Sequence, residues 1–154
     1  MKNISCCYTG HREIPREEIP VVYENIRRVT LKLYDKGFRH FYVGGAVGFD
    51  MLCLEALVAL KESYPEIVIH IIAPCEGHSV RWGEYMKEKF SRLSQYADEV
   101  KYLSPFYFNG CMQIRNRYMV DASSVCIAFV ERKSGGSADT VKYAERQGAE
   151  VIII

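Results

Sequence analysis

The chain has 154 residues, with 20 Lys and Arg against 19 Asp and Glu, so its formal net charge is +1. A chain of this length normally folds around one core, and we expect a single domain spanning residues 1–154. A charge so close to zero excludes a general electrostatic attraction to nucleic acid or to anionic membranes.

The N-terminus lacks the charged and then apolar pattern of a signal peptide, and no apolar run reaches the roughly 18 residues of a membrane span. The six cysteines are scattered without a C-x-x-C pair, and several lie in apolar segments, where a reduced thiol behaves as a small hydrophobic side chain. We therefore expect a cytoplasmic protein with unbridged cysteines, no membrane contact, no metal and no cofactor.

Short β-branched runs alternate with longer segments of helical periodicity, which is the pattern of a parallel sheet covered by helices. The predicted strands, in chain order, are residues 4–8, 41–43, 67–72, 99–102, 125–130 and 151–154. The predicted helices are residues 19–33, 50–63, 80–96, 112–121 and 138–147. This order predicts an α/β three-layer sandwich with a mostly parallel sheet of about six strands.

The apolar faces of these helices follow from residue spacing. In the first helix, apolar residues recur every three or four positions from Ile19 to Leu33, and Gly37 supplies the stop. The second is apolar on most sides and ends before Pro65. The third is predicted to bury one stripe, made of Trp82, Tyr85, Met86, Phe90 and Leu93.

Ligands of parallel sheets collect beyond the carboxyl ends of the strands, so the strand-to-helix loops are the segments to inspect. These loops are residues 9–12, 44–50, 73–81, 104–117 and 133–140.

Two of these loops are rich in glycine and open a helix. The first reads Gly44-Gly45-Ala46-Val47-Gly48-Phe49-Asp50, and the second reads Ser134-Gly135-Gly136-Ser137-Ala138-Asp139-Thr140. Glycines permit a tight turn and close backbone approach, while the free amides at a helix start face an anion. Neither loop matches G-x-G-x-x-G or the P-loop. The alternative is a turn that needs glycine, with Asp50 as a helix cap.

Cationic side chains occur in two other loops. Thr9-Gly10-His11-Arg12 places a hydroxyl, an imidazole and a guanidinium directly after the first strand, where they could reach a phosphate. Alternatively, Arg12 pairs with an acid such as Glu13 and His11 fills a gap. Arg115 and Arg117 cannot both face the core, so we expect at least one to point toward the loops, unless both are simply solvated.

The remaining candidates carry weaker signals. Cys75 and His78 could bind a metal or form a nucleophilic pair, but the second pair of ligands that structural zinc requires is missing. Trp82 and the aromatic run from Phe106 to Phe108 could stack on a base, or could serve core packing or a subunit contact.

With these motifs in hand, the chain resembles the SLOG superfamily, a Rossmann-like group that includes the DprA-type DNA-processing proteins and the Lonely-Guy phosphoribohydrolases, and within it the small bacterial YpsA-like branch. The resemblance covers nearly the whole chain and runs through Thr9 to Arg12, Gly44 to Asp50, Arg81-Trp82, Gly110 to Asp121 and Gly135 to Ser137. It implies a Rossmann-like fold and says little about a reaction.

The phosphoribohydrolases of this superfamily use an arginine in an M-x-x-R-K segment and a glutamate in a P-G-G-x-G-T-x-x-E loop. Met112 to Arg115 fits the first, whereas Lys142 occupies the glutamate position, Ser134 that of proline, Ala138 that of glycine and Asp139 that of threonine. Since the positive charge that develops on ribose calls for a carboxylate, the lysine argues against this activity unless Asp50, Asp121 or Asp139 substitutes.

We therefore hypothesise a domain that binds or senses a nucleotide or sugar phosphate. The alternatives are an N-glycosidic hydrolase, with Arg115, Asp50 and Asp121 as catalytic candidates, and an interaction module that forms homo-oligomers. Nucleic acid is not expected as a partner, because DprA-like binding of single strands usually needs a basic surface. The predicted ligand-binding residues are Thr9, Gly10, His11, Arg12, Gly44, Gly45, Ala46, Gly48, Asp50, Arg81, Trp82, Arg115, Asn116, Gly135, Gly136, Ser137 and Thr140.

Overall fold

The computed structural model describes all residues 1–154 and contains one sheet of six parallel strands. The strands are β1 (Ser5–Gly10), β2 (His40–Val43), β3 (Val68–Ala73), β4 (Glu99–Tyr102), β5 (Val125–Phe129) and β6 (Glu150–Ile153). Their order across the sheet is β4-β3-β2-β1-β5-β6, and every neighbouring pair is parallel. The predicted α/β fold class is confirmed.

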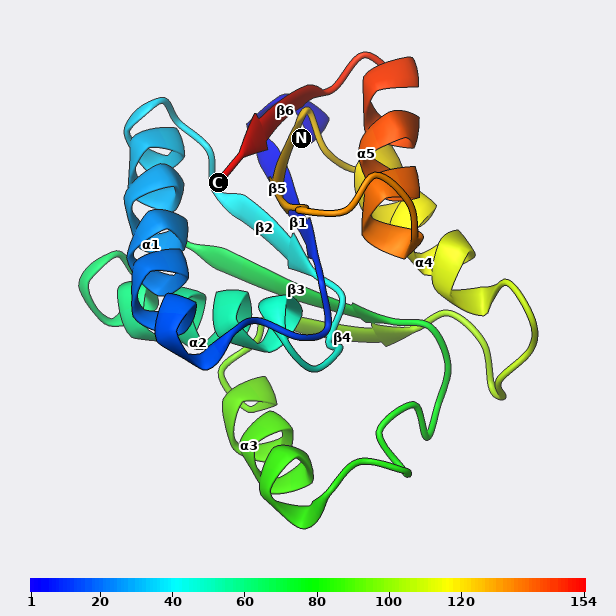
Figure 1. The fold of residues 1–154 in the computed structure, drawn as a ribbon. Helices are drawn as coiled ribbons and strands as arrows, with labels where there is room; N and C mark the ends of the chain where they lie inside the picture. The colour runs from blue at the N-terminus through cyan, green and yellow to red at the C-terminus, as the bar shows by residue number, and fades with distance from the viewer.

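Helices cover both faces of the sheet (Figure 1). They are α1 (Ile19–Asp35), α2 (Phe49–Ser63), α3 (Glu84–Ser94), α4 (Cys111–Asp121) and α5 (Gly136–Arg146), with short 3-10 turns η1 (Lys2–Ile4) and η2 (Arg16–Glu18). Helices α1, α2 and α3 pack on one face, and α4 and α5 on the other. None of the helices is long and apolar enough to cross a bilayer.

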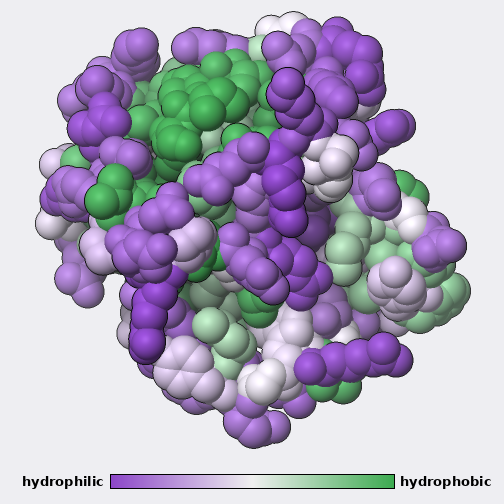
Figure 2. All heavy atoms as spheres, viewed as in Figure 1, coloured by the Kyte–Doolittle hydropathy of each residue, from purple (hydrophilic) through white to green (hydrophobic).

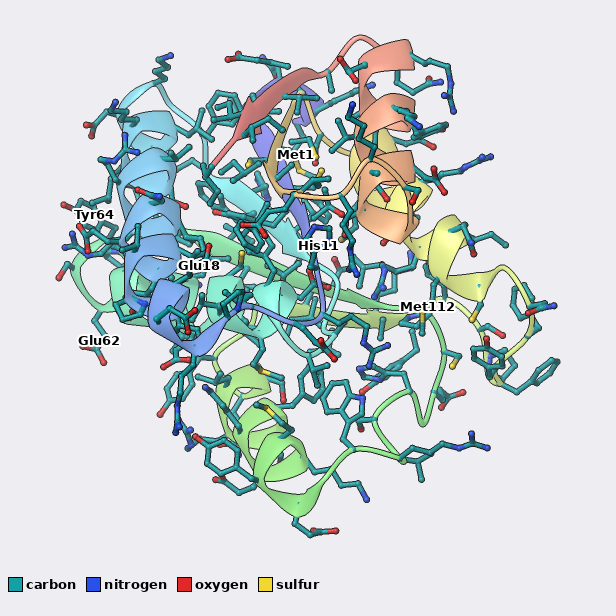
Figure 3. All side chains as sticks on the ribbon, in the orientation of Figure 1. Met1, His11, Glu18, Glu62, Tyr64 and Met112 are labelled. Atoms are coloured by element: carbon teal, nitrogen blue, oxygen red, sulfur yellow. The ribbon has the colours of Figure 1, made fainter.

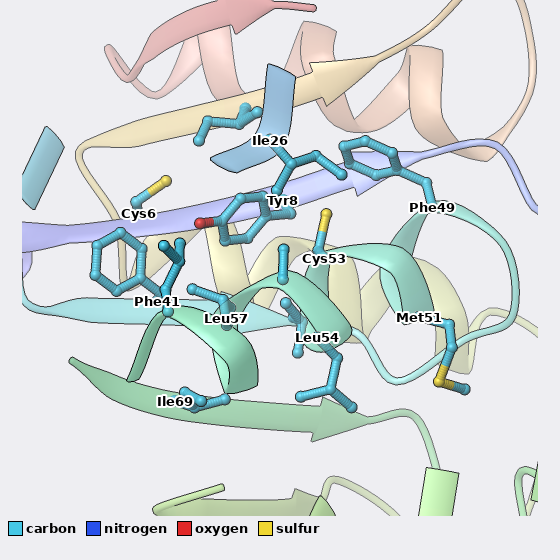
Figure 4. Close-up of a cluster of buried hydrophobic side chains, with 14 of the residues drawn as sticks. Cys6, Tyr8, Ile26, Phe41, Phe49, Met51, Cys53, Leu54, Leu57 and Ile69 are labelled. Atoms are coloured by element: carbon cyan, nitrogen blue, oxygen red, sulfur yellow. The ribbon is translucent and has the colours of Figure 1, made fainter. Parts of the chain in front are cut away.

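The larger core lies between the sheet and the α1, α2 and α3 layer. Because side chains of a strand alternate between its faces, Cys6 and Tyr8 point to this layer while Cys7 points to the other. Figure 4 shows Tyr8 and Phe41 of the sheet packed against Leu54 and Leu57 of α2. The one polar group of Tyr8 is satisfied, since its hydroxyl lies 2.7 Å from Thr30 Oγ1. In the view of Figure 1, hydrophilic residues cover most of the surface, and one hydrophobic patch lies over β6 beside α1 (Figure 2).

The strand order reverses between β1 and β5. Strands β2, β3 and β4 follow β1 toward one edge of the sheet, whereas β5 pairs with the other side of β1 and leads to β6. The loops after β1 and β5 therefore leave toward opposite faces and open a crevice at the carboxyl ends of these two strands, which is where ligands bind in such folds.

One predicted helix differs from the observed one. Helix α3 begins at Glu84 rather than at residue 80, because residues 77–82 form tight turns and Gly83 is extended with φ −66° and ψ 158°. Trp82 therefore precedes the helix, and Tyr85 is 71% exposed instead of buried. Phe90 and Leu93 are buried as predicted. Tyr85 lies five residues before Phe90, which places it off the buried face.

Candidate functional site

A polar cavity of about 570 Å³ lies at the carboxyl ends of β1 and β5. Its walls come from the loops after β1, β2, β4 and β5 and from the starts of α4 and α5, and in Figure 3 His11 marks the end of β1 and Met112 the start of α4. The lining residues are Thr9, Gly10, His11, Arg12, Glu13, Ala46, Asp50, Tyr107, Asn109, Gly110, Met112, Gln113, Arg115, Asn116, Arg132, Ser134, Gly135, Gly136 and Ser137. The size is in the range of pockets for small ligands.

The first turns of two helices border this cavity. Helix α4 starts after Gly110 and α5 after Gly135, each glycine has positive φ, at 91° and 106°, and neither helix has a side-chain cap. The amides of Met112 and Gln113 in α4, like those of Gly136 and Ser137 in α5, make no hydrogen bond within the protein. Unpaired amides and the positive end of the helix dipole favour an anion at both helix starts.

Two exposed arginines add positive charge to the cavity wall. Arg12 follows β1 and Arg132 follows β5, and neither side chain has a carboxylate within ion-pair distance. Arg12 does not pair with Glu13, although both line the cavity. Arg132 Nη2 lies 3.4 Å from His11 Nδ1. The two guanidiniums, on opposite sides of the strand-order reversal, can approach one anion together.

His11 holds the loops after β1 and β5 together. Its Nε2 accepts a hydrogen bond of 2.8 Å from the Glu131 amide, and its ring packs edge-on against Phe129. Burial, followed by the nearby Arg132 charge, lowers the pKa of His11. A neutral imidazole that accepts at Nε2 is consistent with both observations.

Arg115 is buried in the cavity wall beside Asp50. Its Nη1 donates to the carbonyl oxygens of Gly44 and Ile72, and its Nε donates to Asn116 Oδ1 at 2.8 Å, so Nη2 is its only nitrogen without a partner in the protein. Burial lowers the pKa of Arg115, and the Asp50 charge opposes that change. Arg115 thus joins α4 to the ends of β2 and β3, with one group left for a ligand.

Asp50 is the buried carboxylate of the cavity. Burial raises its pKa, although Arg115, the Ala46 amide and Arg12 act in the opposite direction. Its Oδ2 accepts a hydrogen bond of 3.4 Å from the amide of Ala46, a residue that precedes α2. Asp50 does not cap α2, because the bond goes to a residue before the helix and no side chain caps the helix start; it lies in the cavity wall.

The glycines of the loop before α2 serve packing. A Cβ on Gly48, which has φ +82°, would lie 2.2 Å from the Arg12 carbonyl oxygen, and one on Gly10 would lie 2.4 Å from the Phe49 ring. The Phe49 amide donates to the His11 carbonyl at 3.0 Å. Of this loop, Ala46 and Asp50 line the cavity, whereas Gly44, Gly45 and Gly48 do not.

Other predicted site residues lie outside the cavity. Trp82 packs edge-on against His78 and Phe90, and neither Trp82 nor Arg81 is part of the cavity wall. Thr140 donates to the Gly136 carbonyl at 2.8 Å within α5. Asp121 accepts a hydrogen bond of 2.7 Å from the Tyr143 hydroxyl near the other end of α4.

The weak metal candidates do not assemble into a site. His78 Nε2 lies 3.1 Å from the Gly45 carbonyl, to which it donates, and burial lowers the pKa of His78. No group of three or more His, Cys, Asp or Glu side chains could hold a metal ion.

Sequence reasoning missed several cavity residues, including Arg132, Asn109 and Gln113. Arg132 comes three residues after the end of β5, so the rule on strand carboxyl ends could have found it. Asn109 and Gln113 carry no comparable signal, because their position depends on how α4 packs on the sheet.

The fold and the cavity define a doubly wound α/β protein with a polar site at the reversal of strand order. The sequence matches the YpsA family, described as the YspA SLOG family, over residues 10–151, and the chain therefore belongs to this family. The resemblance to the YpsA-like SLOG branch is thus confirmed. The family and fold fit a nucleotide-related binding domain.

Relatives in other bacteria are distant in sequence. The chain is 25% identical over 138 residues to UPF0398 protein SH1465 of Staphylococcus haemolyticus, covering 84% of this chain and 74% of that protein. It is 24% identical over 121 residues to UPF0398 protein OB1025 of Oceanobacillus iheyensis, covering 77% and 65%.

Solved structures with the same fold include two DNA processing proteins A. The protein from Streptococcus pneumoniae aligns with a TM-score of 0.69 and 17% identity, covering 99% of this chain and 50% of that chain. The protein from Helicobacter pylori, which binds single-stranded DNA, aligns with a TM-score of 0.67 and 17% identity, covering 99% and 65%. This chain therefore spans one half to two thirds of those proteins.

Proposed function

We propose that the protein binds a nucleotide or another phosphate-bearing small molecule in the cavity between the loops after β1 and β5. One observation carries this proposal: two uncapped helix starts, at Gly110 and Gly135, border the same cavity as Arg12 and Arg132, which form no ion pair with a carboxylate. Amides at helix starts and guanidiniums are the groups that bind phosphate in proteins. The carboxylates of Glu13 and Asp50 then suit the hydroxyls of a sugar rather than its phosphate.

Thermal unfolding with a panel of nucleotides and ribose phosphates tests the proposal. A ligand at about 100 times its Kd stabilises the folded state by roughly 2.7 kcal/mol, which raises the melting temperature of a domain of this size by about 5–10 °C. The shift should disappear in the variant Arg12→Gln/Arg132→Gln and persist in Arg16→Gln, which removes an exposed cation outside the cavity. The absence of any shift at millimolar ligand would overturn the proposal.

Asp50 supports a second candidate, cleavage of the N-glycosidic bond of a nucleotide. It is a buried carboxylate in the cavity wall with a raised pKa, and such a group can stabilise the positive charge that develops on ribose once it is ionised. Asp121 and Lys142 do not line the cavity, so Asp50 is the better candidate. Release of free base from a panel of nucleoside monophosphates, abolished in Asp50→Asn, tests this reading; no release by the wild type removes it.

We further propose a cytoplasmic location and self-association. All six cysteines are free and buried, as suits a reducing compartment. Phe106 and Tyr107 of the loop before α4 are 65% and 63% exposed, which makes this aromatic loop a candidate contact between copies. Light scattering of the wild type and of Phe106→Ser tests this, since a monomer in both would contradict self-association.

A further inference from the structure

A second hollow of about 180 Å³ lies beside the cavity, between α4 and α5. The two hollows are adjacent, since both are lined by Gln113, Asn116 and Gly136. We call this hollow the α4–α5 groove. Its other lining residues are Arg117, Asp139, Thr140, Lys142, Tyr143 and Arg146.

Positive charge is in excess in the α4–α5 groove. Arg117, Lys142 and Arg146 face a single carboxylate of the lining, that of Asp139, and none of the three has a carboxylate within ion-pair distance. Asp121, which is close by, accepts the hydrogen bond of the Tyr143 hydroxyl. The lining residues of the groove therefore carry a net charge of about +2, which Asp121 offsets only in part.

The ring of Tyr143 holds the two arginines in place. The guanidinium carbon of Arg117 lies 4.9 Å from the ring centroid, and that of Arg146 lies 5.8 Å from it. Cation–π contacts of this kind reduce the freedom of the side chains, so less entropy is lost when an anion binds between them. Two guanidiniums held against one ring form a favourable site for an anion that carries more than one negative charge.

The cations of the groove are attached farther along both helices than the free amides of the helix starts. Lys142 is six residues beyond Gly136 in α5, and Arg117 is six residues beyond Cys111 in α4, which corresponds to about 9 Å along each helix axis. This offset leaves room for one phosphate at the helix starts and another among Arg117, Lys142 and Arg146.

We propose that the α4–α5 groove is a second phosphate subsite and that the ligand of the site is a dinucleotide, with one phosphate at the helix starts and the other in the groove. This inference rests on the proposed function of the cavity and extends it. The shared chemistry is a pair of phosphates joined through a nucleoside, and both a free dinucleotide and the end of a single strand carry it.

Calorimetric titration with the four nucleoside 5′-monophosphates and the matching 5′-phosphorylated homodinucleotides tests the inference. The dinucleotide of the preferred base should bind roughly tenfold more tightly than its monophosphate. Its affinity should also fall more steeply with salt, by about 0.7 in the slope of log K against log salt for the additional phosphate. A longer strand that binds still more tightly assigns the two phosphates to single-stranded nucleic acid, whereas equal affinity assigns them to a free dinucleotide.

A matched pair of variants identifies the groove as the cause. Lys142→Gln/Arg146→Gln removes two exposed cations four residues apart on α5, and Arg28→Gln/Lys32→Gln removes two exposed cations with the same spacing on α1. The α5 variant should keep its monophosphate affinity within about twofold and lose most of the preference for the dinucleotide, and the α1 variant should behave as wild type.

The negative outcomes separate the two proposals. If the monophosphate binds and the dinucleotide binds no more tightly, the groove is not a subsite and the proposed function stands. If the α5 variant retains the full preference, the groove inference also fails. If no nucleotide binds, the cavity proposal fails and the groove inference fails with it.

Discussion

The glycines of the loop before α2 are enclosed by other residues, whereas those of the loop before α5 face open space. An added Cβ would meet the Arg12 backbone at Gly48, and the Asp50 and Arg115 side chains at Gly44, within 2.9 Å in each case. At Gly135 and Gly136 it would meet nothing within 4 Å. In the sequence the two loops look alike, since each is a glycine-rich turn that opens a helix.

The difference shows that glycine has two uses at the same edge of the sheet. Before α2 it lets the chain pack closely, so that Phe49, Asp50 and Arg115 hold the cavity wall together. Before α5 it leaves backbone amides accessible, which is what an anion requires. Substitutions in the loop before α2 should therefore mainly lower the stability of the protein. Substitutions in the loop before α5 should mainly lower its affinity for a ligand.

Loss of Arg115 is expected to have the largest effect on stability. Arg115→Met removes the donor to the Gly44 and Ile72 carbonyls and leaves Asp50 without its charged neighbour, which should cost about 3–5 kcal/mol in the free energy of unfolding. Urea denaturation followed by circular dichroism measures it. Arg117→Met, on the exposed side of the same helix, is the control and should change stability by no more than ~0.5 kcal/mol. Equal effects of the two variants would show that the loop before α2 does not depend on Arg115.

Gly48→Ala is expected to destabilise the protein by roughly 3 kcal/mol, because it combines positive φ with a backbone clash. Gly37→Ala is the matched control, since Gly37 has φ +102° and open space around it, and it should show only the conformational cost of about 1–2 kcal/mol. If both variants lose the same stability in urea, the close approach to Arg12 has no energetic weight.

His78 links the loop before α2 to the pH dependence of stability. Its pKa in the folded state lies below the ordinary 6.5, so its contribution to stability is complete above that pH and is lost as the pH falls through 6.5 toward the folded value. His78→Gln can still donate to the Gly45 carbonyl but does not titrate. Between about pH 7.5 and 5.5 the variant should lose less stability than the wild type, as measured by urea midpoints. Parallel curves would exclude His78 as a contributor.

Gly136→Ala should have the smallest effect on stability and the clearest effect on binding. Its φ is not positive and the added Cβ meets no atom, so stability should stay equal or rise by up to ~1 kcal/mol, the helix preference for alanine. The methyl group lies at the start of α5 and should reduce the melting shift that nucleotides produce. Gly83→Ala, also in open space but outside the cavity, should leave that shift unchanged. An undiminished shift in Gly136→Ala would place the anion away from α5.

Much of the fold could be predicted from local patterns. All six strands are predicted within two residues of their observed ends, because short β-branched runs that alternate with helical segments are typical of a parallel sheet covered by helices. The start of α3 was wrong, because the turns of residues 77–82 contain no proline or cap that marks them. Tyr85 is exposed rather than part of the apolar stripe, whereas Trp82 still packs on the core from its position before the helix.

The candidate site was predictable in its location and less so in its members. The rule that ligands bind beyond strand carboxyl ends points to the loops after β1, β2 and β5, all of which contribute to the cavity wall. It did not separate Gly48, which packs against Arg12, from Gly136, which borders the cavity. It also did not indicate that Arg115 would be buried with two of its nitrogens bonded inside the protein.

The sequence by itself determined the layers, the parallel strands and the edge of the sheet at which the loops gather, because these follow from hydrophobic periodicity and chain direction. Only the tertiary structure decided which loop groups are used in packing and which remain free. The reason is physical: the availability of an amide or guanidinium depends on atoms brought near it by distant segments, such as the Gly44 carbonyl beside Arg115. Local sequence carries no information about those neighbours.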